Sequence, residues 1–485
     1  MCAYNRLYDA PCCGSTYLLN DILREEWGFQ GHIVSDCWAL DDIWARHKVV
    51  ATREEAAAMA AKAGVNLNCG YIYKYLPTAI EKGLIPESIL DTILAPLLRT
   101  RFNLGLFDPP ETVPYSKIGP EVVDSPEHRA LAYETALKSM VLLQNKNSIL
   151  PLHRDSISNI LIAGPTSADI QAMVGNYNGW SGDIITFLEG ITQAVDVGTV
   201  VDYTLGCQMN NPGQYYGFWE AKMADVVIVC LGNSKMMEGE EGEAILNPNG
   251  GDRSDIRLPE SQREYIRMMR EKVPGKPIVA VITGGSAIAI QDVMEAADAV
   301  IMAWYPGEQG GKALADLLFG MANPSGKLPV TFYKSVEDLP PFDDYSMQNR
   351  TYKYFTGEPL FPFGFGLSYS NFTYKSLETN KQTYQKGEDI LVSVALKNDS
   401  RIAGDEVILV YAAKSSAPEE KCLVGFKRVH MEADVEMKIT MSINLNNMFL
   451  WDPDSQQYFV PEGKYILKTD HQLNTNCCQT EIKVE

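Results

Sequence analysis

Residues 27–36 read Trp-Gly-Phe-Gln-Gly-His-Ile-Val-Ser-Asp, and this stretch sets the first expectation for the fold. The β-branched, apolar Ile33 and Val34 predict a short buried strand, and Asp36 follows at its end. In enzymes built on a barrel of alternating strands and helices, catalytic groups lie at the carboxyl ends of the strands. An Asp after a strand is also common as a turn residue or a helix N-cap, and spacing alone favours that simpler interpretation.

The composition is that of a soluble, folded chain. Its 485 residues are 46% hydrophobic and 21% charged, and a chain of this length suggests about two to four domains. A formal net charge of −20 argues against a nucleic-acid surface, which needs a basic patch, and against attraction to anionic membranes. A neutral ligand is easier to reconcile with this charge, although acidity can also serve solubility alone.

The spacing of cysteine and histidine gives no sign of a metal site. The ten cysteines include no Cys-x-x-Cys pair, and the six histidines include no His-x-x-x-His pair. Cys37, next to Asp36, is expected to be a free buried cysteine that packs as a small hydrophobe. The spacing leaves the pairing of disulfides open.

Residues 1–110 are expected to form β/α units. A helical pattern over residues 53–61 lies between the strand before Asp36 and the segment Gly64-Val65-Asn66-Leu67-Asn68. A complete (β/α)₈ barrel needs about 250 residues, so this region is long enough for only two or three units of one.

Residues 125–365 are predicted to form an α/β domain that follows a proline-rich linker, 111–124. Ser125 and Pro126 mark a helix start as N-cap and first helical residue. Four continuous apolar runs alternate with helical patterns such as that of residues 260–272, and such runs indicate parallel strands covered on both faces. The runs are 160–163, 226–229, 278–282 and 299–302. Ligands of open sheets of this kind bind beyond the carboxyl ends of the strands.

Residues 385–485 are predicted to form a small β-sandwich after a second linker, 366–384. Helical patterns end here, and four segments alternate apolar with polar residues, as half-buried strands do. These segments are 389–396, 406–411, 437–443 and 463–467. About 100 residues suffice for such a sandwich.

Several motifs resemble glycoside hydrolase family 3. Tyr4-Asn5, Ser35-Asp36-Cys37-Trp38 and residues 63–68 resemble the nucleophile region of that family. The aromatic and glycine-rich residues 361–369, with the tail, resemble its junction and fibronectin type III-like domain. The resemblance implies an α/β chain of three parts: a partial (β/α)₈ barrel remnant, an α/β sandwich domain with a mostly parallel sheet, and a C-terminal fibronectin type III-like β-sandwich.

The resemblance also implies two catalytic carboxylates. It makes Asp36 the nucleophile of a covalent glycosyl-enzyme, and retaining hydrolysis needs an acid/base carboxyl about 5–5.5 Å away. Residues 238–243 hold four acids, and packed carboxylates raise one another's pKa, which suits a group that must hold a proton. The register of the motif implies Glu240, with Glu238 and Glu241 as competitors, and a solvated acidic surface loop is the plain alternative.

Two aromatic residues are implied as substrate-binding. Tyr4 resembles the tyrosine that borders the sugar subsite of the family, where its hydroxyl would orient the nucleophile. Trp38 would stack on a face of the sugar, although Cys37 intervenes where the family often has the aromatic residue directly after the Asp. Taken alone, Tyr4 also fits ordinary core packing.

The implied activity is that of a retaining exo-β-glycosidase on oligosaccharides, with terminal xylose, glucose and arabinose all open and with no metal or organic cofactor. Met1 corresponds to a position deep inside the family's barrel, so most of that domain is expected to be missing from this chain. The full-length form would be periplasmic or extracellular. Two alternatives follow: a non-catalytic carbohydrate-binding or scaffold protein, or a site completed by a homodimer or by a chain that supplies the missing strands.

Overall fold

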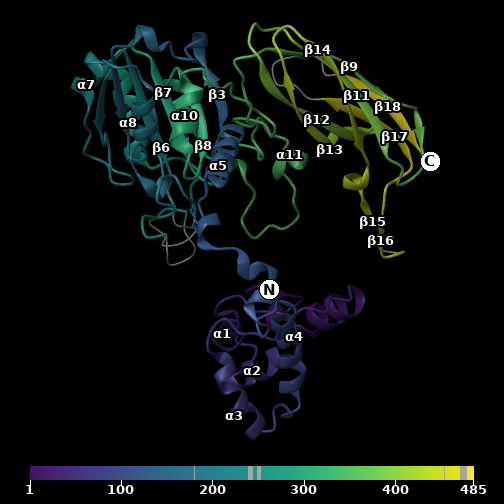
Figure 1. Ribbon diagram of the computed structural model, residues 1–485. Coiled ribbons are helices and arrows are strands. Elements are labelled where there is room, and N and C mark those ends of the chain that lie inside the picture. Colours follow the sequence, from purple (N-terminus) through teal and green to yellow (C-terminus); the bar gives the residue numbers. More distant parts are fainter. Residues whose placement is uncertain (180, 239–243, 248–252, 453, 470–477) are drawn as a thin grey trace. The chain divides into compact units, whose positions relative to one another are not determined.

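The structure, a computed structural model, describes residues 1–179, 181–238, 244–247, 253–452, 454–469 and 478–485 (Figure 1). The chain divides into two units, Met1–Val123 and Asp124–Glu485. The second unit contains a six-stranded sheet with helices, followed by the strands of a β-sandwich. In the described ranges, no helix is long and apolar enough to cross a membrane.

The first unit is mainly helical and is built around α2. A capping box starts this helix: Thr52 accepts from the backbone N–H of Glu55, and Glu55 accepts from that of Thr52. The alanines of α2 are buried in the core of the unit. The elements are β1 (Arg6–Leu7), β2 (Ala10–Pro11), η1 (Cys12–Gly14), η2 (Tyr17–Glu26), α1 (Ala39–Ala45), α2 (Arg53–Lys62), η3 (Ile72–Tyr75), α3 (Leu76–Glu81), α4 (Ile89–Asn103), η4 (Pro110–Thr112), η5 (Pro114–Lys117) and η6 (Pro120–Val122).

The strand predicted before Asp36 is reduced to isolated bridges. Val34 pairs in parallel with Leu67, and Ser35 pairs in parallel with Cys2. Three chain segments therefore run side by side in the same direction, as neighbouring strands of a barrel do. They do not form a more extended ladder of hydrogen bonds, because the chain turns away after Asp36 and enters α1.

The α/β domain of the second unit has the predicted mostly parallel sheet, in the order β3-β8-β7-β6-β4-β5. Only β3 runs antiparallel to its neighbour. The four predicted apolar runs are all strands, and the central β6 and β7 are buried along their whole length. The strands are β3 (Val141–Asn145), β4 (Asn159–Ala163), β5 (Val200–Thr204), β6 (Val226–Gly232), β7 (Ile278–Thr283) and β8 (Ala299–Trp304).

Helices cover both faces of this sheet, as continuous apolar strands require (Figure 1). One face packs against α5 (Pro126–Ser139), α6 (Phe187–Ala194) and α10 (Gly310–Leu318). The other packs against α7 (Phe218–Met223), α8 (Glu260–Lys272) and α9 (Gln291–Ala296). The predicted start of α5 is confirmed, because the Ser125 side chain accepts from the backbone N–H of His128.

Helices α6 and α10 approach closely through glycine. A Cβ atom added to Gly311 would lie 2.0 Å from the Thr186 carbonyl oxygen. We expect Gly311→Ala to lower the free energy of unfolding by about 1–3 kcal/mol, because the backbones must separate. Gly182→Ala is the matched control, since nothing lies within 4 Å of its added Cβ. Urea denaturation of both variants tests this, and equal stabilities would contradict it.

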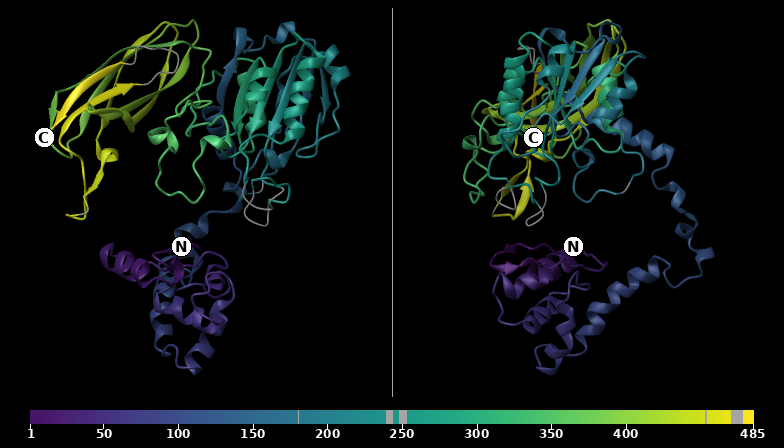
Figure 2. Two further views of the ribbon diagram at one scale, coloured as in Figure 1. Left: turned by 180° about the vertical axis from the view of Figure 1, so that it is seen from behind. Right: turned by 90° about the vertical axis from the view of Figure 1, so that its left-hand side faces the viewer.

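The C-terminal strands form two sheets, in the orders β10-β18-β17-β12-β13 and β14-β11-β9, around one core. The hairpin of β15 and β16 projects from this sandwich (Figure 2). The predicted linker 366–384 is wrong in part, because β9 and β10 belong to the sandwich sheets. The elements are α11 (Thr351–Tyr354), β9 (Phe372–Thr379), β10 (Thr383–Tyr384), β11 (Ile390–Asn398), β12 (Gly404–Lys414), β13 (Ala417–Met431), β14 (Glu436–Ile443), β15 (Leu450–Asp452), β16 (Gln457–Phe459), β17 (Gly463–Thr469) and β18 (Gln479–Val484).

Candidate active site

Asp36 lies at the end of the bridged segment, between two neighbouring chain segments. Its backbone N–H donates to the Cys2 carbonyl at 3.0 Å, and the N–H of Ser35 donates to the Leu67 carbonyl at 2.9 Å. The side chain is half-buried. Its position therefore matches the carboxyl end of a parallel strand, where the sequence predicted it.

The Asp36 carboxylate accepts a hydrogen bond from the residue that follows it. The Cys37 N–H donates to Oδ1 at 2.8 Å. Among the described residues, no hydrogen bond reaches Oδ2. The hydrogen bond from the Cys37 N–H to Oδ1 is also typical of an ordinary turn residue. This geometry is therefore compatible with Asp36 as a catalytic residue and with Asp36 as a turn residue.

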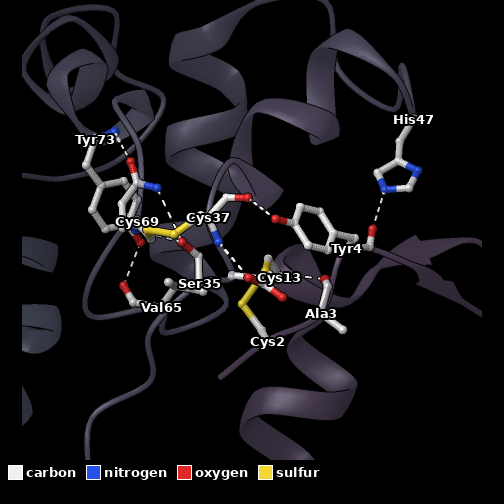
Figure 3. The surroundings of a disulfide bond; sticks show 12 residues. Cys2, Ala3, Tyr4, Cys13, Ser35, Cys37, His47, Val65, Cys69 and Tyr73 are labelled. Atoms are coloured by element: carbon white, nitrogen blue, oxygen red, sulfur yellow. Dashed lines mark hydrogen bonds between the residues drawn. A yellow bond between two sulfur atoms is a disulfide. The ribbon is translucent and has the colours of Figure 1, made fainter. Parts of the chain in front are cut away.

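Tyr4 acts on the backbone next to Asp36. Its hydroxyl donates to the Cys37 carbonyl (Figure 3). Its own carbonyl accepts from His47 Nε2 at 2.7 Å, which places the imidazole proton on that nitrogen. Tyr4 thus reaches the turn that carries the carboxylate, from the segment that the sequence predicted.

Trp38 presents its ring at the surface of the first unit, with 55% of the residue exposed. The ring packs against Tyr71 in a T-shaped arrangement, with the ring centroids 5.5 Å apart. The Tyr71 hydroxyl donates to Asp41 Oδ1 at 2.5 Å, and the Arg53 guanidinium lies over the Tyr71 ring. Sequence reasoning missed this support, because Tyr71 is distant in sequence and has no motif of its own.

The prediction that Cys37 is a free cysteine is wrong. Cys37 forms a disulfide with Cys69, and a second disulfide joins Cys2 and Cys13 (Figure 3). The pairing of Val34 with Leu67 brings Cys37 and Cys69 together, because these cysteines lie three and two residues beyond that bridge. Both disulfides tie segments that flank Asp36.

Glu238 lies in the second unit, at the carboxyl ends of three adjacent strands. The first partner, Asn233 Nδ2, follows β6 and donates to Oε1 at 3.0 Å. After β7, the Gly285 N–H donates to Oε2 at 2.7 Å and Ser286 Oγ to Oε1 at 2.8 Å. After β8, the Tyr305 hydroxyl donates to Oε2 at 2.5 Å. The carboxylate is thus satisfied by the edge of the sheet at which ligands of such folds bind.

An ion pair completes the environment of Glu238. Burial alone would raise the pKa of this carboxyl, but the charge of Arg253, 3.2 Å away, and the hydrogen bonds from Tyr305, Gly285 and Ser286 outweigh burial and lower the pKa. The expectation that neighbouring acids raise the pKa is therefore wrong for Glu238. An ionised, fully bonded carboxylate serves as an anchor and does not store a proton.

The preferred acid/base residue, Glu240, lies outside the described residues, as does Glu241. Glu238 and Arg253 stand on either side of them in sequence, and their ion pair brings together the two ends of this segment. Of the three candidate glutamates, the structure therefore places only Glu238.

Sequence profiles match all three parts of the chain. Residues 1–100 match the Glycosyl hydrolase family 3 N terminal domain, residues 140–369 the Glycosyl hydrolase family 3 C-terminal domain, and residues 406–471 the Fibronectin type III-like domain.

Relatives and solved structures agree with these matches. A xylan 1,4-beta-xylosidase of Xylanibacter ruminicola is 31% identical over 96% of this chain and 71% of its own length. A periplasmic beta-glucosidase of Salmonella typhimurium is 31% identical over 96% of this chain and 65% of its own length. A β-glucosidase structure from Erythrobacter marinus has a TM-score of 0.85 at 29% identity, over 100% of this chain and 67% of its own. The chain thus spans about two thirds of the length of such relatives, and it belongs to glycoside hydrolase family 3.

Proposed function

We propose that the chain is a retaining exo-β-glycosidase that removes a terminal β-linked xylose or glucose from an oligosaccharide. The observation that carries this proposal is the position of Asp36 in the part that matches the family's N-terminal domain. There it ends a parallel bridged segment, with one carboxylate oxygen held by the Cys37 N–H. The relatives named as xylosidases and glucosidases support the two substrate classes.

The proposed reaction has two displacements at the anomeric carbon. In the first, an Asp36 oxygen attacks that carbon and the glycosidic bond breaks, while a protonated carboxyl gives its proton to the leaving oxygen. In the second, the carboxylate that gave up its proton in the first step removes a proton from water, and the water oxygen displaces Asp36. Two inversions leave the configuration of the sugar unchanged.

Glu240 is proposed as the proton donor. The environment of Glu238 supports this choice by exclusion, because Arg253 and the hydrogen-bond donors around Glu238 keep it ionised. Tyr4 and Trp38 are proposed to contact the sugar, and the largely exposed Trp38 is proposed to stack its ring on a sugar face.

We expect Glu240→Gln to reduce kcat about 10²- to 10⁴-fold on a substrate with a poor leaving group, such as xylobiose, because that group needs a proton to depart. A dinitrophenyl xyloside, whose leaving group is a weak base, should form the glycosyl-enzyme at nearly the normal rate. Added azide should then speed turnover and yield the β-glycosyl azide.

Glu241→Gln is the matched control and should keep both activities within a few-fold of the parent. If Glu241→Gln showed the azide effect and Glu240→Gln did not, Glu241 would be the proton donor. A folded chain without turnover on aryl β-xyloside and aryl β-glucoside would instead favour a non-catalytic carbohydrate-binding protein.

A further inference from the structure

The turn that carries Asp36 contains a backbone conformation that needs support. Trp38 has φ 69° and ψ −5°, in the left-handed region, where a large side chain costs free energy. Such residues persist when their surroundings fix them, and they gather at functional sites. Contacts from other segments of the chain therefore hold residues 36–38 in place.

Each residue of this turn has its own restraint, and Figure 3 shows those of Cys37. The Cys37 carbonyl accepts from the Tyr4 hydroxyl, and the Cys37 N–H points at Asp36 Oδ1. The Trp38 N–H donates to the Cys69 carbonyl at 2.8 Å. The disulfide joins Cys37 to the same Cys69. Cys69 therefore holds both residues that follow the carboxylate.

Cys69 is itself fixed to the bridged segment. Its backbone N–H donates to Ser35 Oγ at 2.9 Å, and Asn68 Nδ2 donates to the same oxygen at 3.3 Å. Ser35 is buried and precedes Asp36. The disulfide, together with the hydrogen bond between Cys69 and Ser35, thus closes a loop that runs from Ser35 through the turn to Cys69 and back. Asp36 is one of the residues of this loop.

We infer that the Cys37–Cys69 disulfide positions the Asp36 carboxylate and the Trp38 ring, so that reduction of this one bond uncouples both from the bridged segment. This inference deepens the proposed function and rests on it where catalysis is concerned. With the bond intact, the Cys37 N–H stays directed at Oδ1. Without it, the turn can relax out of the left-handed conformation, and the carboxylate loses its fixed direction.

The Cys2–Cys13 disulfide offers a matched comparison within the same unit. The Cys2 backbone holds the bridged segment, through its N–H to the Val34 carbonyl and its carbonyl to the Asp36 N–H. Its sulfur atom makes no link to the turn. A chain without this second disulfide should therefore still show the change in the turn when the Cys37–Cys69 disulfide is reduced.

The test measures amide hydrogen exchange of residues 36–39 and kcat with and without dithiothreitol. The disulfide takes two electrons and two protons from dithiothreitol, which closes to its own cyclic disulfide, and two thiols result. Peptide mapping counts the thiols formed. We expect exchange at Trp38 to rise at least tenfold on reduction, and kcat to fall about 10²-fold, the scale of a displacement of about 1 Å.

Two double variants separate the bonds. Cys37→Ala/Cys69→Ala should show rapid exchange and low kcat at the outset, with no further response to dithiothreitol. Cys2→Ala/Cys13→Ala should keep the response of the parent chain. Exchange that stays unchanged in the fully reduced parent would overturn the inference, as would equal kcat values for the oxidised parent and Cys37→Ala/Cys69→Ala.

The failure of the proposed function gives a different result. The oxidised parent would then show no turnover that depends on Asp36, while exchange at Trp38 would still rise on reduction. Activity that depends on Asp36 but ignores reduction would keep the proposed function and remove the positioning role of the disulfide.

Discussion

Asp36→Ala is expected to lower kcat/KM on an aryl β-xyloside by about 10⁴-fold or more, because the variant has no oxygen to attack the anomeric carbon. Added azide should occupy the vacated space and act as the nucleophile in a single displacement. The product would be the α-glycosyl azide, whose configuration is inverted relative to the substrate.

Asp91→Ala is the matched control for this experiment. Asp91 is an exposed carboxylate in the first turn of α4, in the same unit. Its removal should leave kcat/KM within a few-fold of the parent. If Asp36→Ala kept normal turnover, Asp36 would be a turn residue only, as its bond from the Cys37 N–H also allows.

Glu238→Ala is expected to lower the free energy of unfolding by about 3–5 kcal/mol, because it leaves a buried charge without its partner. The side chains of Arg253 and Glu238 are only 14% and 13% exposed. Urea denaturation at pH 7 measures the effect. The matched control is Glu378→Ala, whose partner Lys438 and own side chain are each 58% exposed, and it should leave the free energy of unfolding nearly unchanged because solvent screens this pair.

The same ion pair predicts how stability depends on pH. The pKa of Glu238 in the folded chain lies below its ordinary value of 4.5, so its contribution is present above the unfolded-state pKa. That contribution is lost as the pH falls through the folded-state pKa. The difference in stability between the parent and Glu238→Gln should therefore shrink as the pH falls below about 4.5. A difference that is constant from pH 7 to pH 3 would contradict this assignment.

Local patterns were enough to predict the four continuous apolar strands and one long helix of the α/β domain. The helix expected over residues 260–272 is α8, and the run 278–282 lies within β7. Both follow from signals inside the segment: apolar periodicity for the helix, and a continuous β-branched run for the strand. The cap at Ser125 is equally local, since its partner is three residues away.

Long-range contacts determine the features that local sequence patterns could not predict. The disulfide partner of Cys37 lies 32 residues away, and it became predictable only with the pairing of Val34 and Leu67. The charge state of Glu238 depends on Arg253 and on donors from three strand ends, so its acidic neighbours in sequence gave the wrong direction. The left-handed backbone of Trp38 has no signal in its residue type, because tertiary contacts impose it.

Trapping the glycosyl-enzyme tests directly whether Asp36 is the nucleophile. A 2-deoxy-2-fluoro-β-xylosyl or β-glucosyl fluoride carries a good leaving group, while its ring fluorine destabilises both transition states, so the intermediate accumulates. Proteolysis and mass spectrometry then locate the label. If Asp36 is the nucleophile, one sugar unit is expected on the peptide that contains Asp36, and none on the Asp36→Ala chain. A label on another carboxylate, or no label on a chain that turns over aryl glycosides, would contradict this assignment.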